Sequence, residues 1–467
     1  MDPISFMEGE LQQLTDAGIP YLERVGVGNV YIVTPFHKLI DLVLSEVNSS
    51  TLKGMSPAHA GKALKHGIRL NHIFNDEAVL RSQLRKGMDM YFGMLKQKNM
   101  TDSDVVRCCE EANSGTMKRV PPHVVEFATA EDKIEYLVKL YRTRVRENPA
   151  FPKRCDVVQE MAAAIGRGEK VLLEGPQSFW LSNGCEKFWV SSTSANTSAI
   201  GLLAASQLNF QRVKTVVINV HKAPASSRVG IGACPSSFVV QDFFSVRNIR
   251  TLHELPKDIC TDFDAIQSLF FNHAFPYVED PARFNGIPAP IEYADGLGTY
   301  HIGAAMAIAS STFHGEFGAV TRKPRICGFF DCVLHHEVNA FQGPYLAISA
   351  LDRGDAYDRL GITIAYVYYS PTGVVCEANG RRYQNGDIIR SGDPVPSEGV
   401  LAYCHPIVKL VKGWRDAPIA STKRERGAPL PPALCEFLST IEHFTGCKVL
   451  SIGNGPGGDD NIYLNQS

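Results

Sequence analysis

Apolar residues recur at helical spacing in three stretches of the chain. Residues 4–16 form a short amphipathic segment, and Cys155 to Gly166 ends at a glycine, the residue that favours helix C-termini. Residues 77–98 place apolar side chains on one helix side at intervals of three and four: Leu80, Leu84, Met88, Tyr91 and Leu95. The pattern therefore predicts a helix at each of these three places.

Four short apolar runs are typical of β-strands. Val27 to Thr34 is rich in β-branched residues, and Lys170 to Leu173, Val216 to Val220 and Ile362 to Tyr369 show little polar alternation. Runs without alternation suit a sheet that is covered on both faces. Because helical and glycine-rich pieces lie between them, they predict an α/β fold with a mostly parallel central sheet flanked by helices.

Two polar stretches interrupt this pattern. Residues 99–130 are polar, and residues 240–315 are rich in turn-forming residues. We expect both to be irregular insertions in one domain that spans residues 1–467.

Composition narrows the class of protein. Hydrophobic residues make up 44% of the 467, and a net charge of −2 gives no reason to expect nucleic acid or an anionic membrane as partner. The 12 cysteines are scattered without a Cys-x-x-Cys pair, which favours reduced thiols over disulfides or a zinc site. The first residues lack the long apolar run of a signal peptide. We therefore expect a soluble, cytoplasmic protein.

Three loops in the first half carry candidate phosphate or base ligands, although the sequence contains no G-x-x-x-x-G-K-[ST] phosphate loop. Ser50 to Pro57 combines hydroxyls, a lysine and a glycine, which can surround a phosphate or form an ordinary surface turn. Glu174 to Gln177 follows a predicted strand, where open α/β sheets place ligands; a polar turn is the alternative. Ser191 to Ser198 precedes a predicted helix at Ala199 to Leu208, and its hydroxyls can hold a phosphate or only cap that helix.

Three loops in the second half of the chain carry further candidate ligand-binding residues. Thr321 to Arg325 carries cations suited to carboxylate or phosphate, or forms a solvated basic loop. Ser349 to Asp352 places a carboxylate after a predicted strand, where it can accept two guanine hydrogens or cap a turn. Gly453 to Asp460 is a tight glycine-rich loop that allows a flat base to approach. His335-His336-Glu337 lacks the spacing of a metal site, so we treat these residues as ordinary.

The order and spacing of these loops resemble the adenylosuccinate synthetase family over almost the whole chain. Thr51 to Arg69 is similar to the family's T-x-[RK]-G-I-G-P-A-Y-x-x-K-x-x-R-x-G-[IL]-R stretch, and Phe317 to Asp331 to its F-G-x-T-T-G-R-x-R-R-x-G-W-x-D loop. Shorter likenesses occur at Glu174 to Gln177 (E-G-A-Q), Thr193 to Thr197 (T-S-S-N-T), Ser227 to Gly230 (T-R-V-G), Ala350 to Asp352 (K-L-D) and Gly455-Pro456 (G-P).

The resemblance implies a P-loop-related fold and a ligase of AMP biosynthesis. Such enzymes use GTP and Mg²⁺ to phosphorylate the 6-oxygen of IMP, after which the amine of L-aspartate displaces the phosphate. The implied IMP-binding residues are Thr51, Lys65, Gln177, Thr193 and Lys323. The implied aspartate-binding residues are Ala319, Val320, Thr321, Arg322, Lys323, Pro324 and Arg325. The implied GTP-binding residues are Arg325, Ala350, Leu351, Asp352, Gly453, Asn454 and Gly455. Lys65 is expected to reach the IMP of a partner subunit, which implies a homodimer.

The sequence also departs from the family pattern. The family's opening G-D-E-G-K-G-K loop, which supplies the general base and a magnesium ligand, does not occur, nor does its G-x-N-A-G-H, which supplies the general acid. Met1-Asp2-Pro3 resembles a V-D-P that follows both, so we assign no catalytic or metal-binding residue and expect Mg²⁺ ligands in an N-terminal segment outside these residues. Ala350 replaces a lysine that packs on guanine, and Lys323 replaces an arginine.

Three hypotheses follow. The first is an adenylosuccinate synthetase that needs an N-terminal segment for activity. The second is a non-catalytic paralogue that binds nucleotides or dimerises. The third is a related ligase for another purine monophosphate. The substrate-side residues favour the first, because a purely structural protein has less reason to keep them together.

Overall fold

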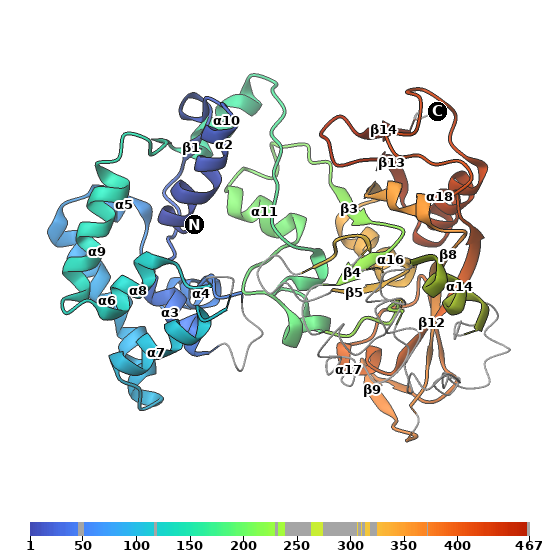
Figure 1. Ribbon diagram of the computed structural model, residues 1–467, viewed down its shortest axis with the longest axis horizontal. Helices are drawn as coiled ribbons and strands as arrows, with labels where there is room; N and C mark the ends of the chain where they lie inside the picture. Colours follow the sequence, from blue (N-terminus) through green and yellow to red (C-terminus); the bar gives the residue numbers. More distant parts are fainter. Residues whose placement is uncertain are drawn as a thin grey trace.

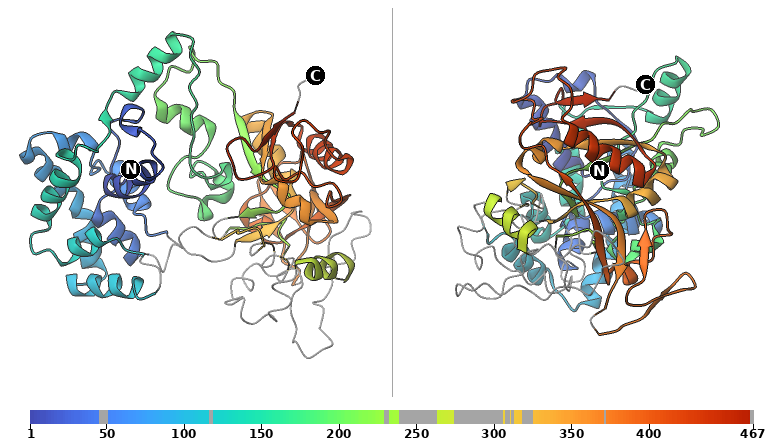
Figure 2. Two further views of the ribbon diagram at one scale, coloured as in Figure 1. Left: turned by 45° about the horizontal axis from the view of Figure 1, so that its top comes forward. Right: turned by 90° about the vertical axis from the view of Figure 1, so that its right-hand side faces the viewer.

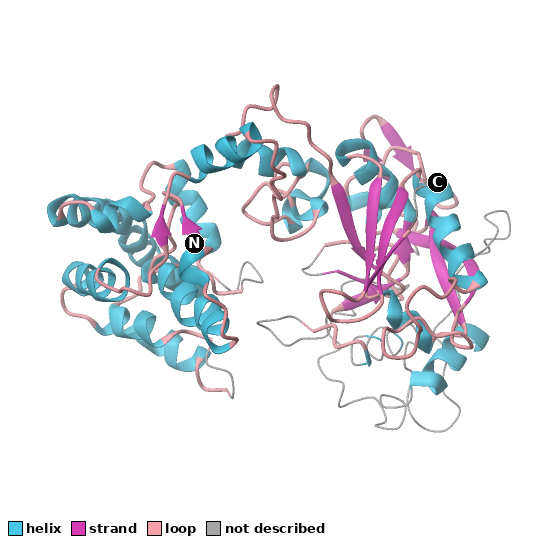
Figure 3. Cartoon of the chain, turned by 90° about the horizontal axis from the view of Figure 1, so that it is seen from above, coloured by secondary structure: helices cyan, strands magenta, loops and turns pink. Residues whose placement is uncertain are grey.

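The structure is a computed structural model, and it divides the chain into a helical lobe and a sheet-containing lobe (Figure 1). It describes residues 1–44, 51–115, 119–228, 232–238, 263–273, 306, 310, 313–317, 325–370 and 372–464. The N-terminus lies in the helical lobe and the C-terminus in the sheet lobe, with the α10–α11 segment between them (Figure 2). Seen from above, strands gather almost entirely on one side of the molecule (Figure 3).

The helical lobe is built from amphipathic helices around one core. It opens with a continuous helix made of α1 (Pro3–Ser5), η1 (Phe6–Leu11) and α2 (Gln12–Asp16), which confirms the prediction for residues 4–16. The remaining helices are α3 (Pro35–Val43), α4 (Met55–Ala63), α5 (Leu70–Phe74), α6 (Glu77–Gln97), α7 (Asp102–Ala112), α8 (Pro122–Thr129), α9 (Lys133–Tyr141) and η3 (Arg142–Arg146). Leu84 and Tyr91 of α6 are fully buried against Phe36 and Phe127, so the helix predicted at residues 77–98 is confirmed.

Two predictions for this lobe were wrong. Of the strand predicted at Val27 to Thr34, only Val27 belongs to a strand, β1 (Gly26–Val27), which pairs in parallel with β2 (Lys153–Arg154). Tyr31 forms an isolated bridge with Arg69. The rest of that run is an extended connection, because its backbone bonds are made at isolated points such as the Ile32 amide to the Ile68 carbonyl (2.8 Å). Residues 99–130 are not irregular: the Thr101 hydroxyl caps α7, and proline at the first turn starts α8. Whether this stretch is an insertion stays a prediction.

The segment between the lobes holds α10 (Val157–Gly166), η4 (Phe179–Leu181), η5 (Glu186–Ser191) and α11 (Ala199–Ser206). The helices predicted at 155–166 and 199–208 are thereby confirmed. The strand predicted at Lys170 to Leu173 is wrong, because these residues form no ladder and Leu172 is 81% exposed. An apolar run becomes a strand only where a neighbouring strand satisfies its backbone groups.

A four-stranded sheet organises the second lobe. β3 (Ile218–Lys222), β7 (Tyr345–Ser349) and β13 (Lys448–Gly453) run parallel, and β14 (Asn461–Tyr463) pairs antiparallel with β13. This confirms a parallel sheet and shifts the strand predicted at 216–220 by two residues. Among the described strands β3 is the outer edge, and its Ile218 and Val220 side chains are 51% and 73% exposed.

The strand predicted at 362–369 belongs to a second sheet. β8 (Arg359–Tyr368) pairs antiparallel with β12 (Cys404–Lys412) and β11 (Ile388–Arg390), and parallel with β6 (Phe330–Asp331). Helices α16 (Cys332–Gln342) and α18 (Pro432–Thr445) pack together beside β8, over a core that includes the buried Trp414.

Smaller elements complete the described part of this lobe. They are β4 (Ser226–Arg228), α14 (Phe263–His273), β5 (Ile326–Gly328), η7 (Leu351–Ala356), β9 (Cys376–Ala378), β10 (Arg381–Tyr383) and α17 (Glu398–Leu401). Most of the expected insertion at 240–315 lies outside the described residues.

Candidate functional site

One buried carboxylate collects three cations at the edge of the parallel sheet. Glu316 accepts hydrogen bonds from Lys222 Nζ (3.0 Å), Arg325 Nη1 (2.9 Å) and Arg353 Nη1 (2.6 Å). The Ser227 hydroxyl donates a fourth bond, at 2.7 Å. The Glu316 side chain is only 2% exposed, whereas the cations are 22–43% exposed. A buried acceptor therefore anchors charged groups that still reach toward solvent.

Electrostatics favours the ionised form of this carboxylate. Burial alone would raise the pKa of Glu316, but hydrogen bonds from Arg353, Ser227 and Lys222 outweigh it and lower the pKa to about 2. Among the described residues, three cations share this one carboxylate. The cluster is thus suited to receive a further anion.

The fold explains why these residues meet. Lys222 ends β3, and Arg353 follows the neighbouring parallel strand β7, so both stand at the carboxyl edge of the sheet, where open α/β sheets bind ligands. The chain leaves β7 through Ala350, whose φ of +58° turns it into η7. Arg325 precedes β5, which pairs with the strand that carries Ser227.

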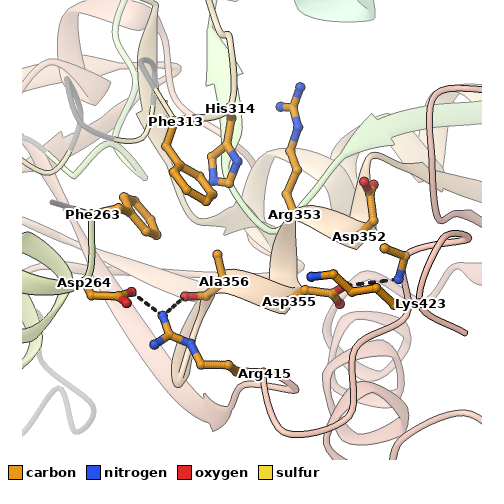
Figure 4. Close-up of a pocket in the computed structure, with 11 residues that line it drawn as sticks. Phe263, Asp264, Phe313, His314, Asp352, Arg353, Asp355, Ala356, Arg415 and Lys423 are labelled. Carbon is orange, nitrogen blue, oxygen red and sulfur yellow. Dashed lines mark hydrogen bonds and ion pairs between the residues drawn. The ribbon is translucent and has the colours of Figure 1, made fainter. Parts of the chain in front are cut away.

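A cavity of about 860 Å³ opens beside this cluster (Figure 4). Its lining comes from α14, the residues before Glu316, η7 and the loop after β12: Phe263, Asp264, Phe313, His314, Asp352, Arg353, Asp355, Ala356, Arg415, Ala420 and Lys423. Burial raises the pKa of Asp352 above its usual value, with backbone hydrogen bonding opposing the shift. A carboxylate in such a cavity prefers a ligand with two adjacent donors.

The loop after β12, which forms another wall of the cavity, is held by hydrogen bonds between side chains and its backbone. Asp355 accepts hydrogen bonds from the amides of Ile419 (2.8 Å) and Ala420 (3.1 Å). Asn454 is buried and donates to the Ile419 carbonyl at 3.0 Å. A methyl group added to Gly453 would lie 3.3 Å from the nitrogen of Ala350, so the glycine-rich loop touches the start of η7.

Six of the seven predicted GTP-binding residues lie at the start of η7 or in the glycine-rich loop that touches it: Ala350, Leu351, Asp352, Gly453, Asn454 and Gly455. Arg325 joins the others through Glu316, since both Arg325 and Arg353 donate to that carboxylate. Nucleotide binding by this group stays a prediction.

The described members of the predicted IMP-binding set lie in a different place, where the helical lobe meets the connecting segment. The Ser56 hydroxyl of α4 contacts the Ser194 hydroxyl, which places the loop that starts at Thr51 beside Thr193. The loop that holds Gln177 is tied to the same serine-rich stretch, because the Thr197 hydroxyl donates to the Ser178 carbonyl at 2.6 Å. Thr51 and Gln177 are exposed.

Lys65 and Lys323 complete that set. Lys65 follows α4 in the left-handed conformation (φ +65°), with an exposed side chain. Lys323 falls outside the described residues, as do all predicted aspartate-binding residues from Ala319 to Pro324. Arg325 is the described end of that loop, and its amide donates to the Glu316 carbonyl at 2.9 Å.

Sequence reasoning missed Glu316, Lys222 and Arg353. Glu316 lies at the border of a stretch expected to be an insertion, and nothing local links it to cations far along the chain. A usable signal did exist for Lys222 and Arg353, because each is a cation near the carboxyl end of an apolar strand: Lys222 ends β3, and Arg353 lies four residues after β7.

Other candidate features are structural. His335 is buried against Phe330 and His221, which lowers its pKa to about 4 through burial. Glu337 pairs with Lys187 and accepts the Val395 amide. Across the described ranges, no group of three His, Cys, Asp or Glu side chains could hold a metal ion. No helix in those ranges has both the length and the apolar character needed to cross a membrane.

Comparisons with known proteins match nearly the whole chain. A family model described as adenylosuccinate synthetase matches residues 1–462. The adenylosuccinate synthetase of Leishmania major is 67% identical over 466 residues, which cover 100% of this chain and 66% of that protein. Adenylosuccinate synthetase 2 of Trypanosoma cruzi is 63% identical over 467 residues, covering 100% and 76%. The chain thus spans about two thirds of the length of its Leishmania relatives.

A solved structure shares the fold. The fully ligated adenylosuccinate synthetase of Plasmodium falciparum superposes with a TM-score of 0.62, covering 98% of this chain and 82% of that one. Sequence identity is 17%, so this likeness bears on the fold alone.

Proposed function

Because the chain belongs to the adenylosuccinate synthetase family, we propose that it is the substrate-binding part of a ligase that joins L-aspartate to IMP at the expense of GTP. The observation that carries this proposal is the cavity at the sheet edge. It combines a partly buried carboxylate, Asp352, with a neighbouring cluster in which, among the described residues, three cations share one carboxylate. A purine nucleotide needs both kinds of group, one for its base and one for its phosphates.

Asp352 gives a reason for GTP rather than ATP. Guanine presents N1–H and a 2-amino group on one edge, and a carboxylate accepts from both. Adenine has an acceptor at N1 and no 2-amino group, so it would leave the carboxylate unpaired at a cost of roughly 1–3 kcal/mol. This base pairing is our proposal for Asp352, next to the Gly453–Gly455 loop.

We propose that IMP binds where the helical lobe meets the connecting segment, to Thr51, Gln177, Thr193 and Lys323, and that Lys65 reaches the IMP bound by the other subunit of a homodimer. The contact between Ser56 and Ser194 supports this, because it joins two of the loops that carry these residues. L-Aspartate would bind residues Ala319 to Arg325, whose described end is fixed on Glu316.

The acid–base groups are proposed to come from sequence that these 467 residues do not contain. The family's G-D-E-G-K-G-K and G-x-N-A-G-H motifs are not found in the chain, and general acid–base catalysis needs such groups in the site. Mg²⁺ with GTP stays a proposal too: the described residues offer no matching ligand set, so we assign it none. A homodimer and a cytoplasmic location are further proposals.

The test is a change of base preference. In a polypeptide that joins this chain to the two motifs, Asp352→Asn turns one acceptor into a donor, which mismatches guanine and matches xanthine. We expect the mutant to lose turnover with GTP and gain it with XTP, measured as kcat/KM for adenylosuccinate formation. Any formation of adenylosuccinate by the joined polypeptide would exclude the hypothesis of a non-catalytic paralogue. An unchanged GTP/XTP ratio would remove the support for GTP and leave Asp352 as a turn residue.

A further inference from the structure

Arg353 is the cation that connects the cavity to the Glu316 cluster. Its Nη1 donates to Glu316 at 2.6 Å, and its side chain, 22% exposed, also lines the cavity next to Asp352. A guanidinium has five N–H donors. Among the described residues, Glu316 is the single side-chain or backbone partner of the Arg353 guanidinium. Donors therefore remain for a ligand in the cavity.

The second arginine of the cavity wall is differently placed. Arg415 donates to Asp264 and to the Ala356 carbonyl, and it pairs with Asp358 at 3.4 Å. Two carboxylates neutralise Arg415, whereas Arg353 shares one carboxylate with Lys222 and Arg325. Among the described contacts, Arg353 is therefore the less neutralised of the two arginines in the cavity wall.

Position along η7 relates Arg353 to the base. Asp352 and Arg353 are consecutive residues of η7, and in Figure 4 both side chains project to the same side of that turn. A ligand whose base reaches Asp352 would extend its remaining groups along the same wall. The carboxylate of Glu316 fixes the guanidinium in place before any ligand arrives, which reduces the ordering cost of binding.

We propose that Arg353 binds the phosphate chain of the nucleoside triphosphate whose base is held by Asp352. This inference rests on the proposed use of GTP and adds a ligand that the family resemblance does not assign. Charge-assisted bonds from a planar guanidinium to phosphate oxygens are the expected contact. Glu316 acts through Arg353, as the residue that positions it.

The experiment compares guanosine with its phosphates. Binding of guanosine, GDP and GTP is measured by titration calorimetry on the wild-type chain and on Arg353→Gln. We expect the mutant to lose roughly 10- to 100-fold in affinity for GDP and GTP, while the affinity for guanosine changes less than about twofold. Arg415→Gln, which removes the same charge from the same cavity, is the matched control and should leave the GTP-to-guanosine affinity ratio unchanged.

One further variant and a stability measurement complete the experiment. Arg353→Lys keeps the charge without the planar fork and should recover part of the lost GTP affinity. Thermal unfolding of each variant checks that the fold is intact. Equal GTP affinity in wild type and Arg353→Gln, or an equal loss for guanosine and GTP, would overturn the inference but leave the proposed function standing. A wild-type chain that binds none of the three ligands would overturn both.

Discussion

The two groups of candidate residues are built in opposite ways. The sheet-edge group centres on Glu316, whose carboxylate is almost fully buried and bonded to four side chains. The group between the lobes consists of exposed loops, of which Thr51 and Gln177 are examples, joined by a few hydroxyl contacts. The first group forms part of the lobe's own structure, while the second adds little to it.

This difference in burial predicts how substitutions in the two groups affect stability and ligand binding. A residue that holds its neighbours through buried charge contributes to folding as well as to ligand binding, because removing it leaves other charges uncompensated. An exposed lysine on a loop contributes to binding alone, because water replaces its contacts in the free protein. Stability and affinity measurements can therefore separate the two groups.

The largest effect is expected at Glu316. Glu316→Gln removes a carboxylate charge that hydrogen bonds from Arg353, Ser227 and Lys222 stabilise. These bonds lower the pKa of Glu316 from 4.5 to about 2, a shift that corresponds to roughly 3 kcal/mol of unfolding free energy at neutral pH. Urea unfolding of both proteins measures the difference. As control, Asp416→Asn breaks the exposed pair with Lys412 and should cost less than about 1 kcal/mol. Equal stability of Glu316→Gln and wild type would show that the Glu316 cluster does not contribute to folding.

The difference in unfolding free energy between wild type and Glu316→Gln should disappear at acid pH. Because the folded-state pKa of Glu316 is lowered, its contribution is complete above the usual 4.5 and is lost as the pH falls toward about 2. The gap in unfolding free energy between wild type and Glu316→Gln should therefore shrink across this window. Urea titrations at a series of pH values test it. A gap that stays constant through the window would assign the effect of the mutation to packing instead of charge.

The smallest effect on stability is expected at Lys65. Lys65→Ala removes a proposed contact to the IMP phosphate and should weaken IMP binding by about 1.5–3 kcal/mol. Unfolding free energy should not change, because the side chain is exposed and alanine keeps the same left-handed backbone cost. Calorimetric titration with IMP gives the affinity. Lys62→Ala, on the same basic stretch, is the control; an equal loss there would point to general electrostatics.

Much of the fold followed from local patterns. The strands β3 and β8 were predicted from runs of apolar and β-branched residues, and the helix α6 from apolar residues at intervals of three and four. Lys170 to Leu173 carries a similar signature without being a strand, since ladder formation depends on a partner that no local pattern reveals. Residues 99–130 were expected to be irregular because short helices with one buried face contain mostly polar residues.

The site was predictable in its loops but not in its centre. Asp352 and Arg325 were found because their motifs are contiguous in sequence. The Glu316 cluster joins residues between 9 and 94 positions away from the carboxylate, and only the folded sheet edge brings them within bonding distance. Such long-range pairing depends on the tertiary structure. The sequence therefore shows many possible charged residues but not which of them pair with Glu316.

The outer edge of β3 has a consequence for how this polypeptide behaves at high concentration. A strand edge with unpaired amides and carbonyls can template the addition of another extended chain, and charged side chains are the usual protection against it. β3 carries exposed Ile218 and Val220, and its one lysine, Lys222, is at the end of the strand and engaged with Glu316. We therefore expect that a charged residue introduced at position 220 would reduce association of chains through this edge.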